Sequence, residues 1–186
     1  MQTINMDTKK ISKFLSRVLR HDPGRIGIEL DPHGWTDCAQ LIGAARRNGV
    51  SLDHALLVEI VRANDKQRFA LNDDQTRIRA NQGHSVEVDL SLEPVTPPAV
   101  LFHGTVDKFI PSILQTGIEK GKRHHVHLSS DIDTASKVGE RRGKPVILKV
   151  DAKAMHDSGR EFFVSGNGVW LTDHVPTEFI ELLPPY

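Results

Sequence analysis

The sequence predicts an α+β protein made of two lobes of nearly equal length. The first half carries helical periodicity followed by one hairpin, whereas the second half is mostly strand with two short helices. Between them lies EPVTPP, in which three prolines in six residues favour an extended linker. We therefore expect an N-terminal lobe at residues 1–92, a linker at 93–98 and a C-terminal lobe at 99–186.

The first half predicts three helices. The first can be capped by Asp7 or Thr8 and ends before Pro23, because proline disfavours helix at the residue before it. Its apolar residues recur with the helical period: Ile11, Phe14, Leu15, Val18 and Leu19. The second helix is expected at about 37–47. The third is expected to start at a Ser51 cap.

A hairpin follows the third helix. RFALN and RIRAN alternate apolar and polar residues and flank the polar turn DDQT. This alternation sets Phe69 and Leu71 against Ile78 and Ala80. Three short helices followed by a hairpin indicate a winged-helix module.

The second half predicts six strands and two short helices. The strands are expected at 99–105, 124–129, 145–150, 160–166, 168–172 and 178–184. The helices are expected near 109–117 and 131–141. Because these strands are interspersed with only two helices, the lobe is expected to be α+β.

Composition excludes several classes of protein. None of the apolar runs approaches the ~20 residues that span a bilayer, and the N-terminus lacks an apolar signal region. Cys38 is the only cysteine and falls in the first turn of an amphipathic helix, so we expect no disulfide and no nucleophilic role. We expect a cytoplasmic monomer. Since the formal net charge is zero, any nucleic-acid site must be a local basic surface.

Several basic residues have two interpretations. Arg20 and His21 end the first helix, where cations interact favourably with the helix dipole, and they could equally bind an anion. Arg20 lies at the edge of the apolar stripe, so we expect it near the hairpin. Arg68 and Arg123 could be ordinary surface cations or anion ligands.

The C-terminal lobe carries an unusual set of histidines. His125 and His127 share one strand face, but no Cys pair or acidic residue at ligand spacing completes a metal site. His103 is followed by Gly104, where the missing side chain would let a ligand approach the backbone. Asn167 belongs to an Asn-Gly pair that favours a type I′ turn.

Taken together, these motifs resemble one family. ISKFLSRVLRHDPGRIGIELDPHGW, NDKQRFAL, LFHGT, RHHVHLSSD, VGERRGKPVIL and FFVSGNGVWLT occur in the order seen in the NAD-dependent RNA 2′-phosphotransferases, the KptA family. The resemblance runs from about residue 9 to 183. It implies a winged-helix lobe joined to an ADP-ribosyltransferase-like lobe.

The resemblance also implies a reaction and a set of site residues. Family members transfer an internal 2′-phosphate of RNA, such as a spliced tRNA, to NAD+. The route passes through an ADP-ribosylated phosphate and releases nicotinamide and ADP-ribose 1″,2″-cyclic phosphate. The residues expected to bind and act on the phosphate are Arg20, His21, Arg68 and Arg123. Those expected to bind NAD+ are His103, Gly104, Thr105, His127, Ser129, Val164 and Asn167.

The chemistry agrees with these residue types. A ribose 2′-phosphate carries nearly two negative charges, which arginine binds through forked, permanently charged donors. We expect no metal, because the arginines supply the positive charge. Two alternatives remain: an ADP-ribosyltransferase that caps terminal phosphates of nucleic acids, and a winged-helix regulator that binds nucleic acid. The resemblance sets the NAD signature of this family on His103, His127 and Val164, whereas protein-modifying ADP-ribosyltransferases usually carry Glu at the third position. Glu161 is three residues from Val164 and, on strand alternation, faces the other way, so protein modification fits less well.

Overall fold

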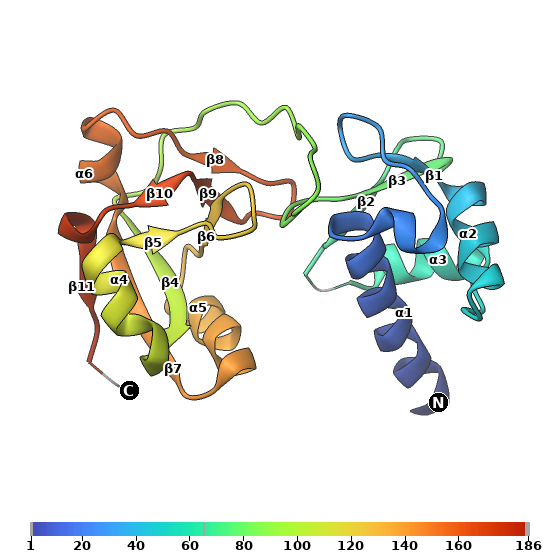
Figure 1. The fold of residues 1–186 in the computed structure, drawn as a ribbon, viewed down its shortest axis with the longest axis horizontal. Coiled ribbons are helices and arrows are strands. Elements are labelled where there is room, and N and C mark those ends of the chain that lie inside the picture. The colour runs from blue at the N-terminus through green and yellow to red at the C-terminus, as the bar shows by residue number, and fades with distance from the viewer. Residues whose placement is uncertain (1, 65, 185–186) are drawn as a thin grey trace. The chain divides into compact units, whose positions relative to one another are not determined.

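The structure is a computed structural model that describes residues 2–64 and 66–184. The chain divides into two compact units, Met1–Ser91 and Leu92–Tyr186 (Figure 1). Both units combine helices with small antiparallel sheets, which confirms the predicted α+β class. None of the helices described is both long and apolar enough to cross a membrane.

The first unit contains three α-helices: α1 (Gln2–Arg20), α2 (Cys38–Arg47) and α3 (His54–Arg62). All three were predicted, but α1 starts before the expected caps Asp7 and Thr8. The prediction that Ser51 caps α3 is wrong. The cap is Asp53, whose carboxylate accepts a hydrogen bond from the Leu56 backbone N at 2.8 Å. A carboxylate this close satisfies one of the donors that a helix start leaves unpaired.

The first unit also holds a three-stranded sheet in the order β1-β3-β2. Its strands are β1 (Thr36–Asp37), β2 (Phe69–Leu71) and β3 (Arg77–Ala80). The predicted hairpin register is confirmed, with Phe69 opposite Ala80 and Leu71 opposite Ile78. Ile78 and Ala80 are fully buried among the apolar faces of the helices, so the opposite face of β3 points outward.

The second unit contains the six predicted strands. Two three-stranded sheets are formed by β4 (Val100–Val106), β7 (Pro145–Asp151) and β11 (Ile180–Leu182), and by β6 (Val126–Leu128), β9 (Trp170–Thr172) and β8 (Phe163–Val164). The predicted helices are α4 (Ile110–Thr116) and α5 (Ile132–Gly139). Elements that were not predicted are β5 (Ile118–Glu119), β10 (His174–Val175) and α6 (Ala152–Asp157).

Two glycines bring α5 close to strand β4 (Figure 1). A Cβ on Gly104 would lie 1.7 Å from the Ala135 carbonyl oxygen of α5. A Cβ on Gly139 would lie 2.8 Å from the Thr105 carbonyl oxygen. The sequence predicts that Gly104 leaves room for a ligand. This prediction is wrong on the side where a Gly104 side chain would point. Helix backbone fills that space, and the glycine permits helix–strand packing.

Candidate functional site

Arg20, His21 and Arg68 lie together in the first unit. Arg20 is the last residue of α1, and its Nη2 donates a hydrogen bond to the Arg68 carbonyl oxygen at 3.4 Å. This contact confirms the prediction that Arg20 lies near the hairpin. The Ser85 backbone N donates to the Arg20 carbonyl oxygen at 2.8 Å, so the end of α1 is joined to the segments before β2 and after β3.

Ser85 is a partner of His21 that the sequence did not reveal. Its Oγ lies 2.9 Å from Nδ1 of His21, across a separation of 64 residues in the chain. A serine hydroxyl can donate or accept, so this contact orients the imidazole in either tautomer. The sequence around Ser85, GHSVEV, matches no motif that would mark it.

His103 and His127 lie together in the second unit. Two backbone hydrogen bonds of 2.8 Å between Phe102 and Ser129 hold the end of β6 against β4. This pairing brings the His127 carbonyl oxygen to 3.0 Å from Nδ1 of His103. Because a carbonyl oxygen only accepts hydrogen bonds, Nδ1 of His103 carries the ring proton and donates the hydrogen bond. In the neutral ring, Nε2 of His103 is therefore an acceptor.

The surroundings of His103 favour its neutral form. Burial lowers the pKa of its imidazole, and the neighbouring charges of Arg142 and Arg123 lower it further. The hydrogen bond to the His127 carbonyl acts in the opposite direction but is the smaller effect. A neutral ring positions a partner through hydrogen bonds and adds no charge.

Arg123 lies with the second unit's histidines. Its Nη1 donates to Nδ1 of His127 at 3.4 Å. Since a guanidinium has no acceptor, Nδ1 of His127 must accept, which leaves the ring proton on Nε2. His103 and His127 thus have opposite tautomers, with an acceptor Nε2 on His103 and a donor Nε2 on His127.

The register separates Val164 from His127. His127 is opposite Leu171, which is opposite Phe163, so these three side chains share one face of the sheet. Val164 is opposite Trp170 and shares the other face with Leu128. The structure does not bring Val164 to His127, and the residue level with His127 in β8 is Phe163.

The remaining predicted residues are placed as follows. Thr105 is buried and shares the strand face of His103. Oδ1 of Asn167 accepts a hydrogen bond from Ser165 Oγ at 2.8 Å. The predicted type I′ turn at Asn167 is wrong, because only Gly168 of that pair has a positive φ, +75°. The Gly168 backbone N donates to the Ser165 carbonyl oxygen, which gives a three-residue loop.

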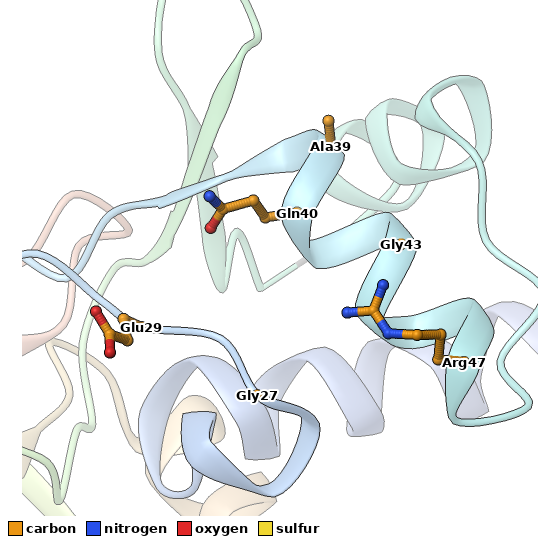
Figure 2. A pocket seen from close by; sticks show the side chains of 6 residues that line it. All are labelled: Gly27, Glu29, Ala39, Gln40, Gly43 and Arg47. Carbon is orange, nitrogen blue, oxygen red and sulfur yellow. The ribbon is translucent and has the colours of Figure 1, made fainter.

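An open, polar pocket of about 450 Å³ lies elsewhere in the first unit (Figure 2). Figure 2 shows Gln40 and Arg47 on α2 and Glu29 on the segment after Gly27. The lining residues are Gly27, Glu29, Ala39, Gln40, Gly43 and Arg47, and they include none of the predicted site residues. Within residues 2–64 and 66–184, no group of three or more His, Cys, Asp or Glu side chains could hold a metal ion.

Comparisons with known proteins cover nearly the whole chain. The model of a family described as "RNA 2′-phosphotransferase, Tpt1 / KptA family" matches residues 6–174. A "Probable RNA 2′-phosphotransferase" of Hahella chejuensis is 54% identical over 175 residues, which is 94% of each chain. A protein of the same name from Trichormus variabilis is 53% identical and covers 94% of this chain and 96% of its own. Another, from Pseudomonas fluorescens, is 56% identical over 92% of this chain and 95% of its own.

Proposed function

Because the chain belongs to the RNA 2′-phosphotransferase, Tpt1 / KptA family, we propose that it removes an internal 2′-phosphate from RNA and transfers it to NAD+. The products would be RNA with a 2′-hydroxyl, nicotinamide and ADP-ribose 1″,2″-cyclic phosphate. The family match over residues 6–174 carries this proposal. The arrangement of basic residues and histidines in the two units supports it.

The first unit would act as a winged-helix lobe that binds the RNA phosphate. Its three helices and β2–β3 hairpin support that assignment. Arg20 and Arg68 would bind the phosphate oxygens, because a guanidinium pairs with a phosphate through two parallel hydrogen bonds. His21, oriented by Ser85, would reach the bond between phosphorus and the RNA 2′-oxygen.

The second unit would act as an ADP-ribosyltransferase-like lobe that binds NAD+ as a co-substrate. The chemistry of its donors and acceptors fits a ribose. A ribose hydroxyl can donate to Nε2 of His103, and Nε2–H of His127 can donate to a ribose oxygen. Arg123 and Arg142 would supply positive charge close to His103, suited to a phosphate.

The reaction would proceed in two displacements. In the first, a phosphate oxygen bonds to the ribose carbon that carries nicotinamide, and the carbon–nitrogen bond breaks. In the second, the 2″-hydroxyl loses its proton to water as its oxygen bonds to phosphorus, and the bond to the RNA 2′-oxygen breaks. His21 would protonate that leaving oxygen, since imidazole exchanges protons near neutral pH. The arginines would stabilise charge on the phosphoryl oxygens, so we expect turnover without added metal.

The test is turnover of a short RNA with one internal 2′-phosphate, mixed with NAD+ and no added metal. We expect the 2′-phosphate to disappear from the RNA and the cyclic phosphate to appear, both followed by chromatography and mass. ADP-ribose that stays attached to the RNA phosphate in the wild type would favour a capping enzyme instead. Unchanged RNA and unchanged NAD+ would refute the proposal.

His21→Ala tests the proton donor. General acid catalysis contributes roughly 10²- to 10⁴-fold, so the second displacement should slow by about that factor and ADP-ribosylated RNA should accumulate. His54→Ala is the matched control, because His54 is an exposed histidine of the same unit whose ring contacts the Gln75 carbonyl. Wild-type turnover by His21→Ala, with no intermediate, would remove His21 from this role.

A further inference from the structure

Arg79 lies on the outward face of β3, where the proposed function assigns no role. The neighbours of Arg79 in the strand, Ile78 and Ala80, are fully buried, so the Arg79 side chain points away from the core. Thr36 is opposite Ile78, and continuing this register sets Trp35 opposite Arg79. The guanidinium carbon of Arg79 accordingly lies 4.7 Å from the centroid of the Trp35 ring.

The two arginines on this face differ in their partners. Arg77 forms an ion pair with Asp31 at 2.8 Å. Arg79 has no acidic partner and no hydrogen-bond acceptor in the part of the chain that the structure describes, and its Nε is buried without a partner. Leaving a charged donor without an acceptor is unfavourable. Nε is closed to solvent, but the Arg79 side chain is only half-buried, so an anion from outside the chain would satisfy its Nη donors.

The sheet places Arg79 beside Arg68. Ala70 is opposite Arg79, and the Asn81 backbone N donates to the Arg68 carbonyl oxygen at 2.9 Å, which extends the register by one pair. Arg68 is therefore a diagonal neighbour of Arg79 on the same face. Diagonal neighbours lie roughly 7–8 Å apart, within reach of two long side chains. Ala70, which is opposite Arg79 on this face, carries only a methyl group.

We propose that Arg79, held flat by Trp35, binds the RNA phosphodiester that leaves the 3′-oxygen of the nucleotide carrying the 2′-phosphate. This inference rests on the proposed function, in which Arg68 binds the 2′-phosphate. The 2′- and 3′-oxygens are on adjacent ribose carbons, so the 3′-phosphodiester is the nearest anion to a 2′-phosphate. Because stacking on Trp35 occupies a face of the guanidinium, its N–H edge remains for phosphate oxygens. Arg79 would thus favour internal over 3′-terminal 2′-phosphates.

The test measures RNA binding without NAD+, by fluorescence anisotropy, so it does not depend on turnover. Two RNAs carry the same internal 2′-phosphate, and one has a neutral methylphosphonate at the 3′-linkage. Arg79→Gln should weaken binding of the natural RNA roughly ten- to one-hundred-fold, as expected for a charge-assisted hydrogen bond. It should leave binding of the methylphosphonate RNA unchanged, and reduce the salt dependence by about one phosphate contact.

Two matched variants show whether a loss of RNA binding comes from the proposed contact of Arg79, from the loss of any positive charge, or from misfolding. Arg62→Gln removes the same charge from an exposed position at the end of α3 and should bind both RNAs as the wild type does. Trp35→Phe keeps the charge of Arg79 and offers a smaller ring, so it should cause a smaller, equally linkage-dependent loss. If Arg79→Gln does not fold, Trp35→Phe carries the test alone.

Equal losses on both RNAs, or no loss, would overturn the inference. Failure of the proposed function would give a different result, because the wild type would then leave the 2′-phosphate on the RNA whatever its affinity for the two RNAs. A wild type that binds both RNAs equally would also overturn the inference, even if it turns both over.

Discussion

Replacing Gly104 by alanine places a methyl group where the backbone of α5 already lies. The new Cβ would be 1.7 Å from the Ala135 carbonyl oxygen and 2.6 Å from the carbonyl carbon. Ordinary van der Waals contact begins at 3.4 Å. Helix backbone cannot move aside by changing a rotamer, so α5 and β4 would have to separate by about the difference between 3.4 Å and 1.7 Å, roughly 1.7 Å.

The expected cost follows from this displacement. Overpacking a core costs typically about 1–3 kcal/mol and occasionally more, and a clash with backbone belongs at the upper end. Alanine also lowers the conformational entropy of the unfolded chain, which offsets the loss of stability by about 0.4–1 kcal/mol. The net loss in the free energy of unfolding should be at least about 2 kcal/mol. For a unit of roughly 100 residues, this lowers Tm by about 8–16 °C.

Thermal unfolding and hydrogen exchange would measure the effect and locate it. Exchange should accelerate in β4 and α5, because those two elements separate. Gly24→Ala is the control, since a Cβ on Gly24 meets nothing within 4 Å. If Gly104 instead makes room for a ligand, Gly104→Ala would unfold like the wild type and only its affinity for NAD+ would fall. A Tm within about 2 °C of the wild type would therefore refute the packing argument.

Three further predictions concern single side chains. Burial tends to raise the pKa of Asp31, but hydrogen bonds from backbone N–H groups and from Arg77 lower it overall. The ionised Asp31 therefore contributes fully to the free energy of unfolding above the unfolded carboxyl pKa of ~3.9, and this stabilisation is lost as pH falls through the lower folded pKa. Asp31→Asn should therefore cost about 1–2 kcal/mol at pH 7 in urea unfolding, and the difference from wild type should shrink below pH 4; a constant difference would contradict this. Burial raises the pKa of the Cys38 thiol to about 11, so it should resist thiol reagents in the native protein and react only on unfolding, and rapid native labelling would disprove this. Asp53→Ala should destabilise the protein by about 1 kcal/mol and Ser51→Ala by much less, whereas the reverse order would restore Ser51 as the cap.

Sequence alone predicted the elements whose own residues carry a period. The three helices of the first unit and the β2–β3 register depend on local spacing, so they could be predicted. Strands β1, β5 and β10 have two residues each and, unlike the two-residue strand β8, lie outside any longer run of strand-forming residues, so no local pattern marks them. They are defined by their pairing partners, which lie far away in the chain. Helix α6 is a six-residue turn capped by Asp151 that carries only a fragment of a helical period.

The candidate site shows the same limit. Arg20 could be placed near the hairpin from its position on the apolar stripe, and that contact is present. Ser85 could not be found, because its bond to His21 closes a loop of 64 residues. Motif order names Val164 as an NAD+-binding residue but does not predict its neighbours in the sheet. The face that it occupies is set by pairing with Trp170, which no local pattern encodes.

The partners of the histidines divide the proposed roles between the two units. His103 donates to a backbone carbonyl, whereas a carboxylate in that place would stabilise the protonated ring. Burial and two nearby arginines disfavour protonation further by lowering the pKa of His103. His103 is therefore suited to orient a ribose and poorly suited to deliver a proton near neutral pH. His21 is exposed and bonded to a neutral hydroxyl, which either form of its ring can accommodate. In the proposed reaction, the proton for the leaving 2′-oxygen would therefore come from the first unit. Substitution of His103 should accordingly impair NAD+ binding without causing ADP-ribosylated RNA to accumulate.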